Sequence, residues 1–312
     1  MSLSTTYEVR DNLALKSVPG FFVQDDIEAI AVAVRKWLWA RVPPRLGLKD
    51  TSDDRWAKFL ALVEKLNEES PPETSFKFFL LARHGQGYHN VGESKYGTVD
   101  WDIINGDEEM IWGRQYLHFY HFKVSSYRLL IRLTADPLLT PLGRQQAADI
   151  QREMIIEAAS GLPPPHKRYC SPFSRALDTC DISFAGVYKD HPHPVLVVEN
   201  CREENGVHTC DKRNTRSYIA SYKPHFSIEE GLTELDELWD PNLRETKEEV
   251  SLRARKIIDM VFENDTDSLY ISITSHSGFI TGFLQAIGRE RYPLPTGGVL
   301  PVVVKRTQPP SS

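Results

Sequence analysis

The chain has 312 residues, and its 41% hydrophobic content is enough for a substantial core in one large α/β domain with additions. The net charge of -6 arises from 37 basic and 43 acidic residues that are mixed along the whole length. This mixture excludes a strongly basic surface, so nucleic acid and anionic membranes are not expected as main partners. Any bound anion must therefore be held by a local cluster of basic residues.

Cysteine usage and hydropathy indicate the compartment. The cysteines are Cys170, Cys180, Cys201 and Cys210. They form no Cys-x-x-Cys pair and lack the Cys/His spacing of a zinc site, so we expect free thiols in a reducing compartment. No secretory signal is visible, and no apolar stretch approaches the roughly 20 residues of a transmembrane helix. We expect a soluble cytoplasmic protein, with the nucleus as a second possibility.

The first part of the chain carries no recognisable chemistry. Residues 1–24 have no clear period and are expected to be irregular. Apolar residues at helical spacing predict amphipathic helices over 25–40 and 53–67. We interpret residues 1–75 as a helical extension that packs on a core formed by residues 76–312.

A short apolar run over 76–81, bounded by turn residues, predicts a buried strand. Arg83, His84 and Gly85 follow it directly. In open α/β sheets, ligands bind at the carboxyl ends of the strands, because the loops that leave the strands form a crevice there. A ligand site at this position needs further residues from elsewhere in the chain.

A basic and aromatic segment runs from Trp112 to Thr134. Such a mixture can bind single-stranded nucleic acid, but one short segment in an acidic chain is a poor electrostatic footprint. Residues 201–245 are polar and rich in turns, which predicts a lid or loop region over a site.

Strands and helices alternate along the remaining sequence. Helices are predicted over 141–158, 176–184, 246–262 and 277–287, and strands over 166–170, 195–198, 269–274 and 299–304. This alternation predicts a three-layer α/β/α sandwich with a mostly parallel central sheet.

Basic side chains follow three of the predicted strands where each strand ends. They are Arg83, His84, Arg175 and His276. A parallel sheet brings such positions to one rim, so two guanidinium groups and two imidazoles are expected to converge. Guanidinium groups bind phosphate oxygens in pairs, and the amides of Ser277 and Gly278 at a helix start add positive partial charge. The sequence predicts a site for a dianion.

These motifs resemble those of the histidine phosphatase superfamily, which has the phosphoglycerate-mutase-like fold. The resemblance covers roughly residues 76 to 306 in the family's order. The motifs are Arg83-His84-Gly85 with Asn90, Leu139 to Gly143, Ser171 to Ala176, Cys201-Arg202-Glu203, and Ser275 to Gly278. The segments Gly85 to Asn90 and His208 to Asp211 look most like the eukaryotic, largely fungal, mutase-like branch.

The resemblance implies a covalent mechanism. His84 would attack phosphorus and become phosphohistidine. Arg83, Arg175 and His276 would hold the phosphoryl oxygens and stabilise their charge in the transition state. Glu203 would protonate the departing oxygen and then take a proton from the attacking water.

Two adjacent carboxylates are candidates for the acid. The family's usual leucine before Arg-Glu is Cys201 here, and a second carboxylate, Glu204, follows directly. We favour Glu203 by position and keep Glu204 as the alternative.

Further polar residues are candidates for the substrate side. Asn90 would add a polar contact. His89, His208 and Asp211 are either groups on the substrate side or plain loop residues. His191 and His193 lie between prolines without a carboxylate pattern, so we expect no metal.

The sequence thus predicts a metal-independent phosphomonoester hydrolase that needs no cofactor and acts on a small phosphorylated metabolite. The alternatives are a phosphoglycerate-type phosphomutase and a non-catalytic scaffold that keeps the fold. The substrate itself cannot be read. Residues 113–134 depart from the family pattern as an atypical insertion, for which translated intron sequence is one hypothesis.

Overall fold

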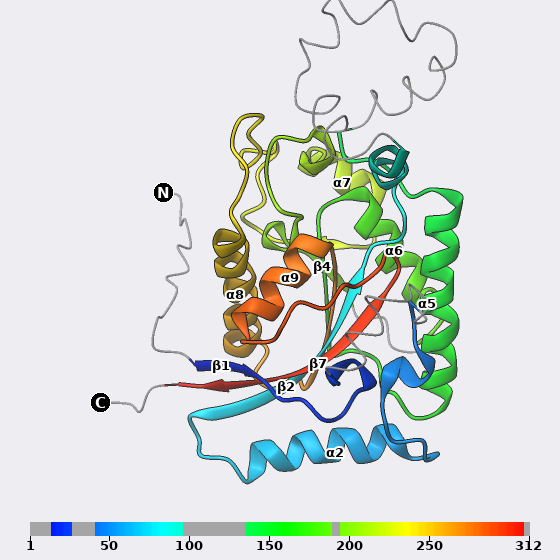
Figure 1. Cartoon of the computed structure of the whole chain (residues 1–312), viewed down its shortest axis with the longest axis vertical. Coiled ribbons are helices and arrows are strands. Elements are labelled where there is room, and N and C mark those ends of the chain that lie inside the picture. The colour runs from blue at the N-terminus through cyan, green and yellow to red at the C-terminus, as the bar shows by residue number, and fades with distance from the viewer. Residues whose placement is uncertain (1–13, 27–40, 96–134, 189–193, 309–312) are drawn as a thin grey trace, which may run out of the picture.

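A computed structural model describes residues 14–26, 41–95, 135–188 and 194–308. In these residues the strands form one seven-stranded sheet with the order β1-β7-β2-β6-β3-β4-β5 (Figure 1). The strands are β1 (Ala14–Ser17), β2 (Thr74–Arg83), β3 (Lys167–Cys170), β4 (Val195–Val197), β5 (Ser227–Ile228), β6 (Tyr270–Ser275) and β7 (Val299–Thr307). Strands β2, β6, β3, β4 and β5 run parallel, whereas β7 runs antiparallel to both β2 and β1. The mostly parallel α/β class predicted from the sequence is confirmed.

Helices cover both faces of this sheet and build two separate cores. One face carries α2 (Arg55–Glu68), α5 (Pro141–Ala159) and α6 (Ser174–Phe184), and the other carries α8 (Lys247–Asn264) and α9 (Ser277–Ala286). Strand β2 is apolar on both faces, since Phe78 and Leu80 point into the first core and Phe79 and Leu81 into the second. Alternate side chains of a strand point to opposite faces, so the continuous apolar run predicts this double burial. The result is a three-layer α/β/α sandwich.

Two long helices begin at threonine caps that the sequence makes visible. The Thr140 hydroxyl accepts a hydrogen bond from the Gly143 amide at 3.0 Å, and Pro141 occupies the first position of α5. At the start of α8, Thr246 and Glu249 form a reciprocal capping box. These local signals explain why the first residues of both helices were predictable.

The segment before residue 76 contributes to the sheet and to one of its faces. Trp56 and Phe59 of α2 pack against Phe78 of β2. The expectation that residues 1–24 are irregular was wrong for residues 14–17, because β1 pairs antiparallel with β7. Four residues with a single fully buried side chain are too short a pattern to reveal a strand.

The region 201–245 also holds regular structure that was not predicted. It contains the helix α7 (Arg216–Tyr222), which begins at the cap Thr215, and the two-residue edge strand β5. The predicted helices and strands that lie in the described residues are present, with ends shifted by a few residues.

Some expectations lie outside the described residues. These are the insertion over 113–134, residues 27–40 of the helix expected over 25–40, and the two histidines His191 and His193. Within the part of the chain that the structure describes, all four cysteines are buried free thiols, as expected. No described helix combines the length and apolar character that a membrane crossing requires.

Candidate active site

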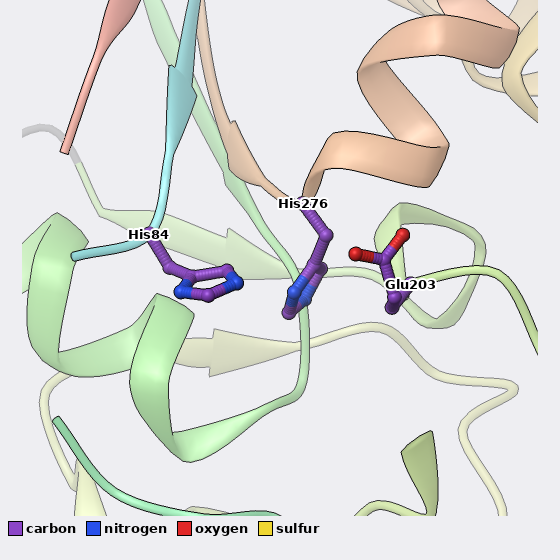
Figure 2. Close-up of side chains that lie close together, drawn as sticks. All are labelled: His84, Glu203 and His276. Atoms are coloured by element: carbon purple, nitrogen blue, oxygen red, sulfur yellow. The ribbon is translucent and has the colours of Figure 1, made fainter. Parts of the chain in front are cut away.

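The predicted convergence of side chains at one rim of the sheet is present. His84 follows β2, His276 follows β6, and Glu203 comes just after the short helical turn η4 (Glu199–Cys201) that leaves β4. One ligand-type atom from each of these three side chains lies within 4.8 Å of the others. In the view of Figure 2, the His276 ring lies between the ring of His84 and the carboxylate of Glu203. Residues far apart in the chain therefore form one cluster.

The ring of His84 is fixed and buried. Its Nδ1 lies 2.6 Å from the Gly85 carbonyl oxygen, which can only accept, so Nδ1 carries the proton and Nε2 keeps a lone pair. Burial, followed by the charges of Arg175 and Arg83, holds the pKa of His84 well below the ordinary value for histidine. A neutral imidazole with a free lone pair is the form that a nucleophile needs.

Glycines allow α5 to hold the loop that follows His84. A Cβ added to Gly85 would lie 2.2 Å from the Gly143 carbonyl oxygen, and one added to Gly143 would lie 2.1 Å from that of Gln86. The Gln86 amide also donates to Oε1 of Gln146 at 2.7 Å. Since no side chain fits at either glycine, the two motifs that contain them depend on each other.

Arg175 lies in the first turn of α6 and is fully buried. Its Nη1 donates to the carbonyl oxygen of Cys210 at 2.8 Å, and its guanidinium carbon lies 4.6 Å from the centre of the Phe173 ring. Two buried carboxylates flank the group, with Asp136 3.8 Å from Nη1 and Asp211 3.6 Å from Nη2. The guanidinium is thus held in one orientation.

Several buried nitrogen atoms near His84 have no hydrogen-bond partner among the described residues. They are Nε of Arg83, Nε and Nη2 of Arg175, and Nδ1 of His276. The other ring nitrogen of His276 lies 2.7 Å from the Ser171 hydroxyl, which leaves Nδ1 as the ring atom for another partner. Unpaired buried polar atoms are rare because each is costly, so their convergence marks a binding site. The guanidinium charges favour an anion there over a cation.

The two candidate carboxylates are directed differently. Oε1 of Glu203 accepts hydrogen bonds from the amides of Gly278 at 2.7 Å and Glu204 at 2.9 Å, and its Oε2 lies 3.3 Å from the Ser277 hydroxyl. Glu204 forms an ion pair with Lys247 instead. Ser277 and Gly278 were expected to contact phosphate. In the structure the Gly278 amide and the Ser277 hydroxyl contact Glu203, whose carboxylate reaches the start of α9 from a distant loop.

The loop after His84 brings two more predicted residues near the ring. Asn90 closes this loop, because its Oδ1 accepts a hydrogen bond from the Gly87 amide at 3.0 Å. The ring of His89 is 5.4 Å from that of His84, and its buried Nδ1 has no partner among the described residues. His208 is buried beside the Arg244 guanidinium, 3.1 Å from Nε2 to Nη2.

Sequence reasoning missed two polar residues of this neighbourhood. Ser171 contacts His276, and Asp136 accepts hydrogen bonds from the amide and the hydroxyl of Ser174. Ser171 stands within a motif that was recognised, so its position was a usable signal. Asp136 has the positive φ of 64°, which is uncommon for a residue with a side chain and leaves no trace in the sequence.

The fold and the cluster together define a class: three-layer α/β/α proteins with histidines and arginines at the carboxyl rim of a parallel sheet. The chain belongs to branch 1 of the histidine phosphatase superfamily, whose family model matches residues 126–295. The matched range begins after Arg83 and His84, which the geometry above places in the same site as Arg175 and His276.

Similar proteins are found in fungi and among solved structures. A "Probable phosphoglycerate mutase" of Arthroderma benhamiae is 32% identical over 306 residues, covering 94% of this chain and 84% of that protein. A protein of the same description from Saccharomyces cerevisiae is 32% identical over 325 residues, covering 94% and 96%. The crystal structure of the ecdysone phosphate phosphatase from Bombix mori in complex with tungstate matches with a TM-score of 0.43 and 16% identity, covering 67% of this chain and 76% of that chain.

Proposed function

We propose that the protein is a metal-independent phosphomonoester hydrolase that acts on small phosphorylated metabolites through a phosphohistidine at His84. The observation that carries this proposal is a set of buried nitrogen atoms of Arg83, Arg175 and His276 around a neutral His84 ring, which have no hydrogen-bond partner in the described part of the chain. A phosphoryl dianion offers several acceptor oxygens and two negative charges, so it satisfies these nitrogen atoms together.

The reaction has two halves. In the first, the lone pair on Nε2 of His84 forms a bond to phosphorus while the bond from phosphorus to the ester oxygen breaks, and Glu203 donates a proton to that oxygen. In the second, water attacks the phosphohistidine, Glu203 takes the proton from the water, and the bond from phosphorus to nitrogen breaks. Inorganic phosphate leaves and both side chains return to their starting forms.

The arginines stabilise the charge that spreads over the phosphoryl oxygens in the transition state. Arg175 is buried and already oriented by its contacts with Cys210 and Phe173, so little reorganisation is needed when the reaction occurs. Loss of one such oriented donor typically lowers kcat by about 10²–10³-fold.

Substitution of the nucleophile tests the proposal. His84→Ala should abolish phosphate release from a generic aryl phosphate, and mass spectrometry at alkaline pH should find a phosphoryl group on the wild type but not on the variant. His225→Ala is the matched control, since this exposed histidine lies beside Asp181, with 2.9 Å between Nε2 and Oδ1, and outside the cluster. Turnover that survives in His84→Ala contradicts the proposed nucleophile.

A phosphoglycerate-type mutase is the second candidate, and the descriptions of the two fungal relatives favour it. A mutase must retain the phosphoryl group and exclude water from the same histidine. Incubation with phosphoglycerates separates the two functions, because a mutase interconverts the isomers whereas a hydrolase releases inorganic phosphate. A non-catalytic scaffold is disfavoured by the presence of the complete residue set around His84.

A further inference from the structure

The two carboxylates that flank Arg175 are held in very different ways. Asp136 accepts hydrogen bonds from the Ser174 amide at 2.8 Å, the Ser174 hydroxyl at 2.7 Å and the Asn214 side-chain amide at 3.0 Å. Its acceptor oxygens are therefore occupied in the folded protein. Asp136 is a fixed structural support for the start of α6.

Asp211 has no comparable set of contacts among the residues that the structure describes. Its nearest ionisable neighbours are Nη2 of Arg175 at 3.6 Å and Nδ1 of His208 at 3.9 Å, both beyond hydrogen-bond distance. The thiol of Cys210, at 3.7 Å, is a weak donor. Burial of a carboxylate is costly unless good hydrogen bonds offset it, so a loosely held buried carboxylate indicates a role beyond folding.

The atom that Asp211 faces is also an atom that a bound phosphoryl group requires. Nη2 of Arg175 lacks a hydrogen-bond partner among the described residues, and Arg175 lies close enough to His84 to lower its pKa. A phosphoryl dianion and an ionised Asp211 therefore compete for the same guanidinium and repel each other. Protonation of Asp211 removes the repulsion and leaves Arg175 to the phosphoryl group.

We propose that Asp211 is a positioning residue that links anion binding at Arg175 to the uptake of one proton. In the free site the ionised carboxylate balances the positive charge of Arg175. When the dianion binds, the carboxylate takes a proton from solvent and becomes a neutral neighbour of Arg175. The inference rests on the proposed function only for the existence of the dianion site, and it does not require turnover.

The surroundings of Asp211 are consistent with a group that titrates near neutrality. The titratable and charged groups that face it are Arg175 of α6, Arg202 and Glu203 after η4, His208 and Cys210 of its own turn, and Arg244 before α8. The net pKa of Asp211 is raised from the ordinary 3.8 to about 7, because burial, the largest cause, and the charge of Glu203 together outweigh the lowering by Arg175, Arg244 and Arg202. Ligand-type atoms of His208, Cys210 and Asp211 lie within 4.8 Å of one another, but Arg175 and Arg244 beside them disfavour a metal cation.

Calorimetric titration with sulfate tests the linkage, because sulfate remains a dianion across the neutral range whereas phosphate changes its charge. Titrations in two buffers with different ionisation enthalpies give the number of protons taken up per sulfate bound. For the wild type we expect uptake approaching one proton near pH 8, and an affinity that falls up to about tenfold per pH unit above the pKa of Asp211. Asp211→Asn should bind sulfate with little uptake and little dependence on pH.

Asp181→Asn is the control, since Asp181 is a partly exposed carboxylate paired with Lys223 and His225 away from the cluster. It should keep the wild-type proton uptake. Equal uptake by wild type and Asp211→Asn assigns the protons to other groups, such as the histidines or Asp136, and overturns the inference. Loss of sulfate binding at every pH in a folded Asp211→Asn protein also overturns it, because the role is then structural only.

A measurement on the unmodified protein covers the case in which Asp211→Asn does not fold. Infrared difference spectra near pH 8 should gain the carbonyl band of a protonated carboxyl group when sulfate binds, and absence of that band overturns the inference. Phosphate release is measured separately. Hydrolysis without proton-linked binding defeats this inference alone, whereas linked binding without hydrolysis defeats only the proposed function.

Discussion

The stability of Asp211→Asn relative to wild type should increase as the pH rises. Burial raises the pKa of Asp211 from the ordinary 3.8 to about 7 in the folded protein. A raised pKa means that the contribution of this carboxyl to stability is fully present below the unfolded value and is lost as the pH rises through the folded value. Asparagine resembles the neutral carboxyl group at every pH, so the variant does not suffer this loss.

The size of the effect follows from the pKa. Between the two values, each pH unit changes the free energy of unfolding by about 1.4 kcal/mol. The interval from about pH 5.5 to the pKa in the folded protein is about one and a half pH units, and the effect levels off above that pKa. The free energy of unfolding of the variant relative to wild type should therefore increase by about 2 kcal/mol between about pH 5.5 and about pH 8. Contacts that Asn makes or loses at both pH values cancel in this comparison.

Urea-induced unfolding at the two pH values, followed by tryptophan fluorescence, measures the gain. The quantity to compare is the difference in unfolding free energy between variant and wild type at each pH, with Asp181→Asn as a control that should show no such trend. A difference that is equal at both pH values, or that shrinks as the pH rises, refutes the argument that Asp211 is a poorly compensated buried carboxylate.

Two further substitutions probe neighbouring contacts. Gly278→Ala places a Cβ 2.2 Å from Oε1 of Glu203 and must displace that carboxylate. We expect kcat to fall by about 10²-fold or more, with little change in the thermal midpoint of unfolding. An unchanged kcat contradicts the role of Glu203. Asp136→Asn puts an amide donor where Asp136 accepts from both donors of Ser174, and urea unfolding should show a loss of about 1–3 kcal/mol. A stability equal to wild type means that those contacts are not needed.

Local sequence signals predicted much of the fold. The apolar run of β2 is long enough to be recognised, and Thr140 followed by Pro141 defines the start of α5. By contrast, β1 has four residues and depends on pairing with β7, almost three hundred positions away in the chain. The strand is defined by this pairing and not by a local residue pattern, so the sequence alone did not predict it.

The candidate site also has some features that the sequence predicts and others that it does not. The carboxyl ends of parallel strands necessarily meet, so the convergence of His84 and His276 followed from the order of the strands. The partner of the Gly278 amide did not follow, because Glu203 reaches it from a separate loop. The contrast between Asp136 and Asp211 was equally hidden, since it depends on which hydrogen-bond donors the packing brings to each carboxylate.

The antiparallel direction of β7 decides which end of that strand borders the reaction. Val299 pairs with Ala82 near His84, whereas Thr307 pairs with Thr74 at the opposite end of β2. The segment that precedes β7 therefore borders the site, where the carbonyl oxygen of Leu294 accepts a hydrogen bond from Arg83. A purification tag or fluorescent protein fused after β7 would begin about 30 Å from the nucleophile, because the nine residues of β7 lie between them. That end is a suitable attachment point for immobilising the protein in turnover assays.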